Sequence, residues 1–172
     1  MILTKKINLI LCLCLVMGCA QAKNLQVLVK VIDINVVQSL EKQGDEVYFS
    51  VMRYSNLEKP SEARIPSYPA YWLSDQLSKV KNVVLWSGFI QEGEDVRVLL
   101  SLIEEDQALW ATKDLGSAEL RLRNRKGILE QQWGIPSFEK TQEVEMVAGE
   151  PQRYVFKGSG SRYDVAFEVE QK

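Results

Sequence analysis

Ala118-Glu119-Leu120-Arg121-Leu122-Arg123 is the most regular stretch of this chain of 172 residues. Apolar and charged side chains alternate along it, and successive side chains of a β-strand point to opposite faces. Ala118, Leu120 and Leu122 would therefore share a face that packs on a core, while the charged side chains would face water. The stretch predicts a strand in a sheet that is covered on one side only.

Seven further segments are rich in Val, Ile, Leu and aromatic residues and are bounded by turn residues, as strands are. They are residues 25–34, 46–54, 83–90, 96–103, 143–147, 153–157 and 162–170. Residues 55–70, which contain three prolines, and residues 104–114 are expected to be loops. About eight strands and no long segment of helical period predict an all-β fold, an antiparallel sandwich of two sheets.

Two pairs of these segments are predicted to form hairpins. Residues 83–90 and 96–103 flank a short acidic turn, and residues 153–157 and 162–170 flank the glycine- and serine-rich residues 158–161. The two hairpins would join strands that follow each other in the chain and lie side by side in one sheet.

The composition excludes most common catalytic sites. The chain contains no histidine, which removes Ser-His-Asp triads, Cys-His dyads and zinc sites that use histidine. Glu92, Glu94 and Asp95 lie on one short turn and are interpreted as a charged hairpin tip, because glycosidase carboxylates stand on opposite sides of a cleft. We therefore expect no enzyme activity, no cofactor and no small-molecule ligand.

The N-terminus has the order of a secretory signal: Lys5 and Lys6, an apolar run at residues 7–17, then small residues. This run is too short to span a bilayer, which takes about 20 residues. Leu15-Val16-Met17-Gly18-Cys19 resembles the lipobox of bacterial lipoproteins, which have an aliphatic residue three positions before the cysteine and a small one directly before it. The resemblance implies cleavage after residue 18 and acylation of Cys19.

The lipoprotein resemblance also implies a location. An aspartate after the cysteine favours the inner membrane in that family, and Ala20 stands here instead, which implies the outer membrane of a Gram-negative cell. The alternative is ordinary signal cleavage after Ala20-Gln21-Ala22, which would release a soluble protein. The expected organisation is a signal at residues 1–18, a tether at 19–24 and one domain at 25–172.

The mature chain would contain 19 basic and 23 acidic residues, because the only charged side chains of the signal are Lys5 and Lys6. This mildly acidic balance gives no reason to expect nucleic acid as a partner. Cys12 and Cys14 would leave with the signal, so Cys19 would be the single cysteine and no disulfide would form within the domain. Stability then has to come from apolar burial.

Residues 96–122 resemble the late loop and following strand of C2 domains, the phospholipid-binding β-sandwiches. The resemblance lies in an apolar strand, the acids Glu104-Glu105-Asp106, and then Lys113-Asp114-Leu115-Gly116 before the alternating strand. Asp45-Glu46-Val47-Tyr48 resembles an Asp-Pro-Tyr-Val segment of that family, without the proline. A C2-like topology is therefore favoured over an immunoglobulin-like one.

Calcium is not expected in spite of this resemblance. Calcium sites gather several carboxylate oxygens from two loops. The positions where the family carries aspartates hold other residues here, namely Glu105, Gln107 and Lys113. Asp45, Asp106 and Asp114 could still cluster, but solvated loop acids are the better interpretation, since a lysine would repel the ion. We therefore expect no metal site.

Two groups of residues are candidates for contact with a partner. Arg121, Arg123, Arg125 and Lys126 form a basic stripe that could meet anionic lipid or an acidic protein, or could be an ordinary solvated face. Tyr68, Tyr71 and Trp72 lie in a proline-rich loop that could form a protein contact, or could pack over the end of the sandwich.

The sequence thus predicts a non-enzymatic lipoprotein that faces the periplasm. We expect it to be a structural or assembly subunit of an envelope complex, such as a secretion-system core, with other envelope proteins as partners. The alternative is a C2-like module that binds anionic lipid at the membrane surface.

Overall fold

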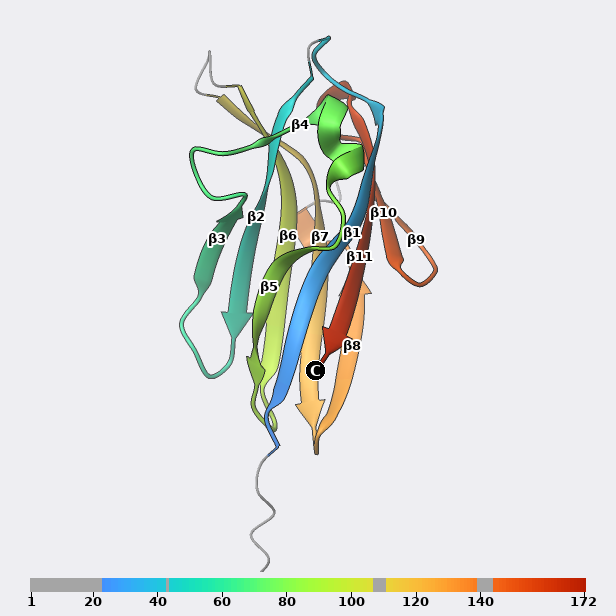
Figure 1. Ribbon diagram of the computed structural model, residues 1–172. Helices are drawn as coiled ribbons and strands as arrows, with labels where there is room; N and C mark the ends of the chain where they lie inside the picture. Colours follow the sequence, from blue (N-terminus) through green and yellow to red (C-terminus); the bar gives the residue numbers. More distant parts are fainter. Residues whose placement is uncertain (1–22, 43, 107–110, 139–143) are drawn as a thin grey trace, which may run out of the picture.

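Two antiparallel sheets packed face to face form the molecule in the computed structural model, which describes residues 23–42, 44–106, 111–138 and 144–172 (Figure 1). The described strands are β1 Leu25–Gln38, β2 Glu46–Ser55, β3 Ser61–Ile65, β4 Trp72–Leu73, β5 Val83–Ile90, β6 Asp95–Asp106, β7 Ala111–Arg125, β8 Ile128–Gly134, β9 Val144–Val147, β10 Gln152–Phe156 and β11 Arg162–Gln171. Short 3₁₀ helices span Ser74–Lys79 and Gly158–Gly160. None of the described helices is long and apolar enough to cross a bilayer.

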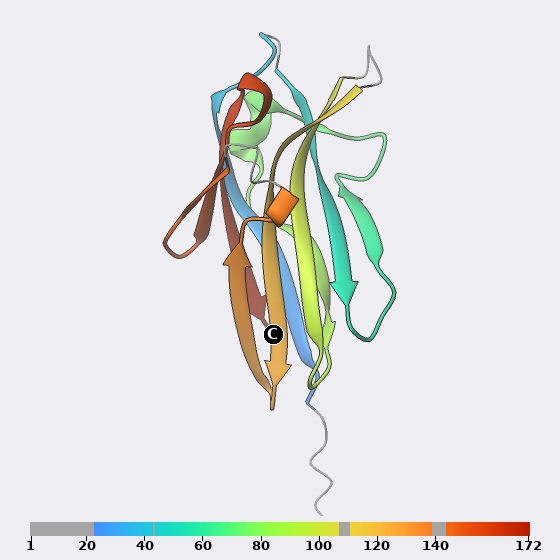
Figure 2. The same cartoon turned by 180° about the vertical axis from the view of Figure 1, so that it is seen from behind.

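The strand order keeps the two sheets distinct. One sheet has five strands in the order β5-β1-β11-β10-β9. The other has six, in the order β3-β2-β6-β7-β8 with the short β4 also on β2. Figure 2 shows the same two layers from behind, with β7 and β8 now in front. The prediction of an all-β antiparallel sandwich is confirmed.

The core lies between the sheets and contains the alternating residues that the sequence pattern places inward. Ala118, Leu120 and Leu122 are fully buried, as predicted from the opening stretch. The rings of Phe49 on β2 and Phe167 on β11 meet edge to face across the two sheets, with centroids 5.9 Å apart. Apolar burial therefore joins the two layers along their length.

The prediction that residues 83–90 and 96–103 form a hairpin is wrong. β5 pairs with β1 in the five-stranded sheet, whereas β6 pairs with β2 and β7 in the six-stranded sheet. The turn between them crosses from one sheet to the other. The second predicted hairpin, of β10 and β11, is confirmed.

Two expected loops contain strands. β6 and β7 continue through residues 104–106 and 111–114 and form a long hairpin there, because the backbone ladder does not need apolar side chains. β3 lies within the proline-rich residues 55–70 and pairs with β2. Its first three residues, Ser61, Glu62 and Ala63, are exposed, as an edge strand allows. The segment therefore lacks the apolar alternation that would have identified it as a strand.

Glu94 is not part of a solvated tip, as the sequence suggested, but is buried where the chain crosses between the sheets. Its side chain is 1% exposed and accepts a hydrogen bond from Arg53 of β2 at 2.8 Å. It also accepts the hydroxyl of Ser55 and the backbone N–H of Gln91. This carboxylate links the β5–β6 turn to β2 and so ties one sheet to the other.

Asn124 fixes the end of the molecule at which the described chain begins. Its buried amide group donates hydrogen bonds to the carbonyls of Lys23 at 2.7 Å and Ile90 at 2.9 Å. Its side-chain oxygen accepts the N–H of Gly127 at 2.9 Å, and its backbone carbonyl accepts the N–H of Gly93. The start of β1, the β5–β6 turn and the β7–β8 turn are thus held together.

We predict that Glu94→Ala lowers the free energy of unfolding by about 3 kcal/mol, because it leaves the buried Arg53 guanidinium with only the half-exposed Glu58 as an ion-pair partner. Glu92→Ala is the matched control, since it removes an exposed carboxylate from the same turn, and it should change stability by less than about 0.5 kcal/mol. Urea denaturation followed by tryptophan fluorescence measures both. Equal effects of the two substitutions would show that the buried pair does not stabilise the fold.

Candidate functional site

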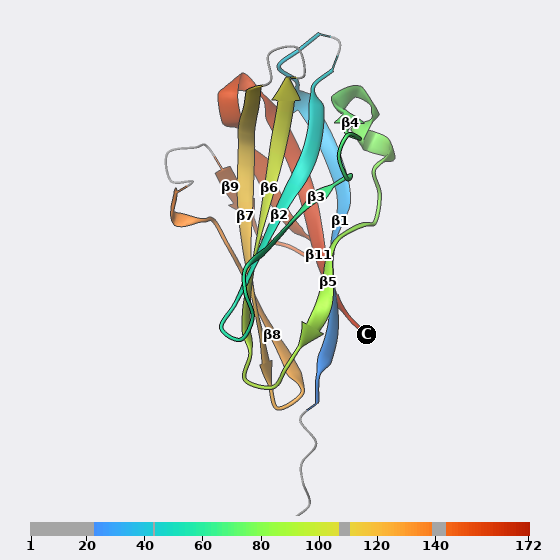
Figure 3. The same cartoon turned by 90° about the vertical axis from the view of Figure 1, so that its left-hand side faces the viewer.

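The outer side of the six-stranded sheet carries a patch that we call the docking face. It consists of Tyr48 and Met52 on β2, Leu99 and Ile103 on β6, and the arginines Arg64, Arg97 and Arg121 around them. Their chain neighbours on β2, β6 and β7 point into the core, so these side chains point outward. Figure 3 views the molecule from the side of β2 and β3, where this face lies.

The docking face contains two apolar cross-strand pairs, with the serine pair Ser50–Ser101 between them. Met52 lies directly opposite Leu99, and Tyr48 lies opposite Ile103, across the β2–β6 pairing. All four side chains are half-buried. The solvent-facing side of an antiparallel sheet is usually polar, which makes these two apolar pairs informative.

Arg64 connects the predicted aromatic loop to the docking face. Its guanidinium lies 3.8 Å from the centre of the Tyr48 ring and 5.3 Å from that of Tyr68, which is 68% exposed. It also pairs with Glu105 at 2.5 Å and donates to the carbonyl of Ala70 at 3.3 Å. The contact with Arg64 places the exposed Tyr68 ring beside the face.

The other two aromatic candidates lie differently. Trp72 is half-buried on β4 and meets the ring of Phe49 edge to face at 6.3 Å, so much of its indole belongs to the core. Tyr71, directly before it, is half-buried as well. Of the three predicted contact residues, Tyr68 is the one that the structure places in the open beside the docking face.

The arginines of the predicted basic stripe are each paired with a carboxylate. Arg121 pairs with Glu119 at 2.7 Å, Arg123 with Asp95 at 2.5 Å and Arg125 with Glu130 at 3.1 Å. Each carboxylate offsets the positive charge of its arginine. The hydrogen bond to Glu119 also raises the pKa of Arg121. The stripe therefore presents little net positive charge to an anionic surface.

Lys126 differs from these arginines. It lies in the turn between β7 and β8 with a backbone φ of 54°, and its side chain is exposed. Within the described part of the chain it forms no ion pair. The structure thus divides the stripe, with Arg121 and Arg123 on the outer face of β7 and Lys126 at the end of the molecule.

Sequence reasoning missed Arg64 and Arg97. Arg97 lies opposite Arg121 across the β6–β7 pairing, and its guanidinium lies 5.0 Å from the centre of the Tyr54 ring. The alternation of β6 was a usable signal for Arg97, since it lies between Val96 and Val98. No signal identified Arg64, because it lies in a segment that was expected to be a loop.

A second polar cluster lies at the opposite end of the molecule from Asn124. The buried Asp45 carboxylate accepts backbone N–H groups of Leu40 at 2.9 Å and Glu41 at 2.8 Å, and it accepts the hydroxyl of Tyr163 as well. The backbone N–H of Asp45 donates to the hydroxyl of Ser74. Every oxygen of this carboxylate is engaged, so the cluster is suited to holding the β1–β2 connection rather than to acid–base chemistry.

Glu104 lies close to this cluster and is also buried. Burial raises the pKa of its carboxyl, and the Lys113 ammonium 3.2 Å away opposes that effect. The Asp114 carboxylate instead accepts the backbone N–H of Gly116 at 2.9 Å, so this bond lies within β7.

The residues considered for calcium are distributed over these separate contacts. Glu105 pairs with Arg64, and Lys113 with Glu104. Gln107, the side chain of Asp106 and the proposed lipidation site Cys19 lie outside the described residues. No group of three acids, cysteines or histidines that could hold a metal ion is found among the residues whose placement the structure describes.

We predict that Tyr163→Phe makes stability less sensitive to alkaline pH. Burial raises the pKa of Tyr163, and its hydrogen bond to Asp45 adds to this effect; burial raises that of Tyr154 as well. Above about pH 10 the unfolded state releases a phenolic proton that the native state keeps. The free energy of unfolding therefore falls as pH rises, by about 1.4 kcal/mol per pH unit for each of these tyrosines.

Urea titrations between pH 9 and pH 11 measure this dependence. Above about pH 10, Tyr163→Phe should make the free energy of unfolding fall less steeply with pH, by the contribution of one proton. Tyr154→Phe should have the same effect. An unchanged slope in both variants would mean that these hydroxyls ionise equally easily in the folded and unfolded chain.

Comparison of the chain with models of protein families, with curated proteins and with solved structures finds no match. A function therefore has to be inferred from the residues of the chain and from their arrangement.

Proposed function

We propose that the chain is a non-enzymatic lipoprotein of the bacterial outer membrane, anchored through Cys19 and facing the periplasm. It acts as a structural or assembly subunit of an envelope complex, such as a secretion-system core. The lipobox-like stretch supports the anchor, and the docking face supports the role in assembly.

The docking face is the observation that carries this proposal. Protein interfaces have an apolar centre and a polar rim, and tyrosine and arginine contribute much of their binding energy. The face has the apolar pairs Met52–Leu99 and Tyr48–Ile103, and Arg64 and Arg97 lie near tyrosines beside them. Because Arg64 is already held between Tyr48 and Tyr68, little side-chain entropy remains to be lost on binding.

The position of the N-terminal end supports a short connection to a membrane. Lys23, which follows Cys19 by four residues, is held by Asn124 at one end of the sandwich. An anchor at Cys19 would keep that end close to the bilayer. The docking face runs along the side of the sheet and would stay accessible to a neighbouring envelope protein.

A C2-like strand order with binding of anionic lipid is the second candidate. The resemblance of residues 96–122 supports it, and so does the exposed Lys126 beside Ile128, which is 68% exposed. The pairing of Arg121, Arg123 and Arg125 with carboxylates weighs against the arginine stripe as its contact surface.

We predict that Leu99→Arg separates the protein from its partner without unfolding it. The new side chain would lie opposite Glu119, which can accept its charge, and it would replace the apolar contact with Met52 by a cation. Loss of a central contact costs about 2 kcal/mol or more, which corresponds to at least a tenfold weaker complex. Purification from detergent-solubilised membranes measures the amount of partner recovered.

Phe89→Arg is the control for this experiment. Phe89 is a 62% exposed apolar residue of β5 on the other sheet, and the variant should recover the partner in wild-type amounts. A wild-type protein that purifies alone would contradict the assembly proposal. If it instead sediments with anionic vesicles, and Leu99→Arg does so equally, lipid binding becomes the better account.

We predict that Cys19→Ala leaves the sandwich folded but removes it from the outer membrane. Two acyl signals suffice for stable anchoring, and the variant would have none. Membrane fractionation and immunoblotting locate the protein, and circular dichroism checks the fold of the purified variant. Unchanged fractionation with the outer membrane would show that protein contacts, rather than lipid, hold the chain there.

A further inference from the structure

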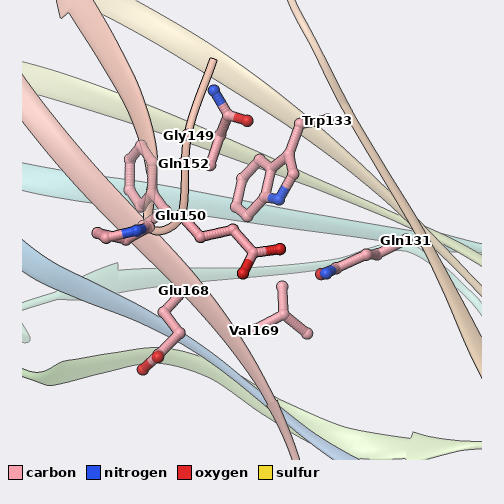
Figure 4. A pocket seen from close by; sticks show the side chains of 9 residues that line it. Gln131, Trp133, Gly149, Glu150, Gln152, Glu168 and Val169 are labelled. Carbon is pink, nitrogen blue, oxygen red and sulfur yellow. The ribbon is translucent and has the colours of Figure 1, made fainter. Parts of the chain in front are cut away.

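An open groove lies between the two sheets on the side of β8 and β11. It has a volume of about 370 Å³ and is lined by Gln131 and Trp133 of β8, by the β9–β10 turn, and by the end of β11. Figure 4 shows the carboxylate of Glu150 and the amide of Gln131 pointing toward each other over Val169, beside the indole of Trp133.

The groove is a place where the core is incompletely covered. Gln131 lies opposite Leu122 and Trp133 opposite Leu120 in the β7–β8 pairing, and both of these leucines point into the core. Gln131 therefore occupies an inward position, yet it is exposed. Val169, on the inward side of β11, is only half-buried. The sheets diverge here and leave apolar surface open to solvent.

The groove lies between two free strand edges. β10 pairs with β11 only as far as Phe167, so residues 168–171 of β11 are paired with β1 on one side and with no described strand on the other. β8 is the last strand of its sheet, and its sequence contains neither proline nor lysine. Backbone groups at such edges are ready to pair with another extended chain.

Two of the other described edges, β3 and β9, are protected in ways that this one is not. β3 has five residues and lies between Pro60 and Pro66. β9 has only four residues. Short edge strands and flanking prolines are common devices against strand pairing. Of the described edges, the one beside the groove and that of β5, which has eight residues without proline or lysine, lack these devices.

The charges around the groove are one-sided. Glu150 and Glu168 line it, and no lysine or arginine does. Lys30 lies opposite Glu168 on β1 but its ammonium bonds to Glu170 instead. Neither Glu150 nor Glu168 forms an ion pair within the described chain, whereas most arginines of the protein are paired. A ligand of this groove would therefore have to supply the positive charges that balance Glu150 and Glu168.

We propose that this groove binds an extended peptide segment of a partner protein in which apolar residues alternate with lysine or arginine. The segment adds as a strand beside residues 168–171 of β11, and its backbone bonds to the free edge. Its inward side chains cover Trp133 and Val169. A basic side chain inside the groove meets Glu150, and one on the outer side meets Glu168, whose carboxylate points the other way in Figure 4. This site is independent of the docking face.

Fluorescence anisotropy of a labelled heptapeptide of alternating Val and Lys tests the proposal with the purified full chain. We expect saturable binding, and at least tenfold weaker binding of the same peptide with N-methylated amides, which cannot pair as a strand, or with Glu in place of Lys. The double variant Glu150→Gln and Glu168→Gln removes the two exposed ion pairs that the glutamates would form with lysines of the peptide. It should weaken peptide binding about tenfold.

The matched control is Glu145→Gln with Glu62→Gln, which removes two exposed carboxylates away from the groove and should leave the affinity unchanged. Equal binding of the Glu peptide, of the N-methylated peptide or to the double variant would overturn the proposal, and so would no binding. Concentration-dependent dimerisation abolished by the double variant would assign the edge to a second copy of the chain instead. Because Leu99→Arg leaves this site intact, it should bind the peptide normally, which separates this result from the test of the docking face.

Discussion

The inner faces of the two sheets have to bury each other, and every other feature of this molecule follows from that constraint. The domain from residue 23 onward contains no cysteine and only short described helices, so apolar burial between the sheets is its main source of stability. Strand residues alternate between faces, and a fixed inner set therefore determines the outer set. Tyr48, Leu99 and Arg121 point outward because Val47, Leu100 and Leu120 point inward.

The few polar groups inside this core lie where the chain changes direction. Glu94 and Arg53 hold the crossing from β5 to β6, Asn124 holds the start of β1, and Asp45 holds the β1–β2 connection. Glu94, Asn124 and Asp45 each have several hydrogen-bond partners, which offset the cost of removing them from water. Polar contacts thus fix the ends of the sandwich, while apolar contacts fix its middle.

The alternating pattern was sufficient to predict the strands that contribute to the core, but it does not contain their pairing. Val83–Ile90 was predicted with the bounds that the structure has, yet its partner is β1 and not β6. Pairing depends on which strands meet in space, and the buried contact of Glu94 with Arg53 joins residues 41 positions apart. β3 and β8 escaped prediction because edge strands expose both charged and apolar side chains.

The candidate site was predictable to a similar degree. Composition and period identified Tyr68 and Arg121 as exposed candidates for contact. They did not predict that Arg64 lies between Tyr68 and the sheet. The pairing of Arg121 with Glu119 follows from the period of two, since residues i and i+2 share a face. The pairing of Arg123 with Asp95 required the β6–β7 register, which no local pattern supplies.

The two proposed contacts use different chemistry and would therefore make different demands on a partner. The docking face offers side chains over a flat sheet, so a partner needs a complementary surface of fixed shape. The groove beside β11 offers backbone groups and an apolar floor, so a partner needs only an extended segment with the right alternation. In the proposed arrangement, a flexible segment could reach the groove from a distance before the larger surfaces meet. The proposed groove contact would then suit capture of a partner, and the proposed docking-face contact would suit the final fit.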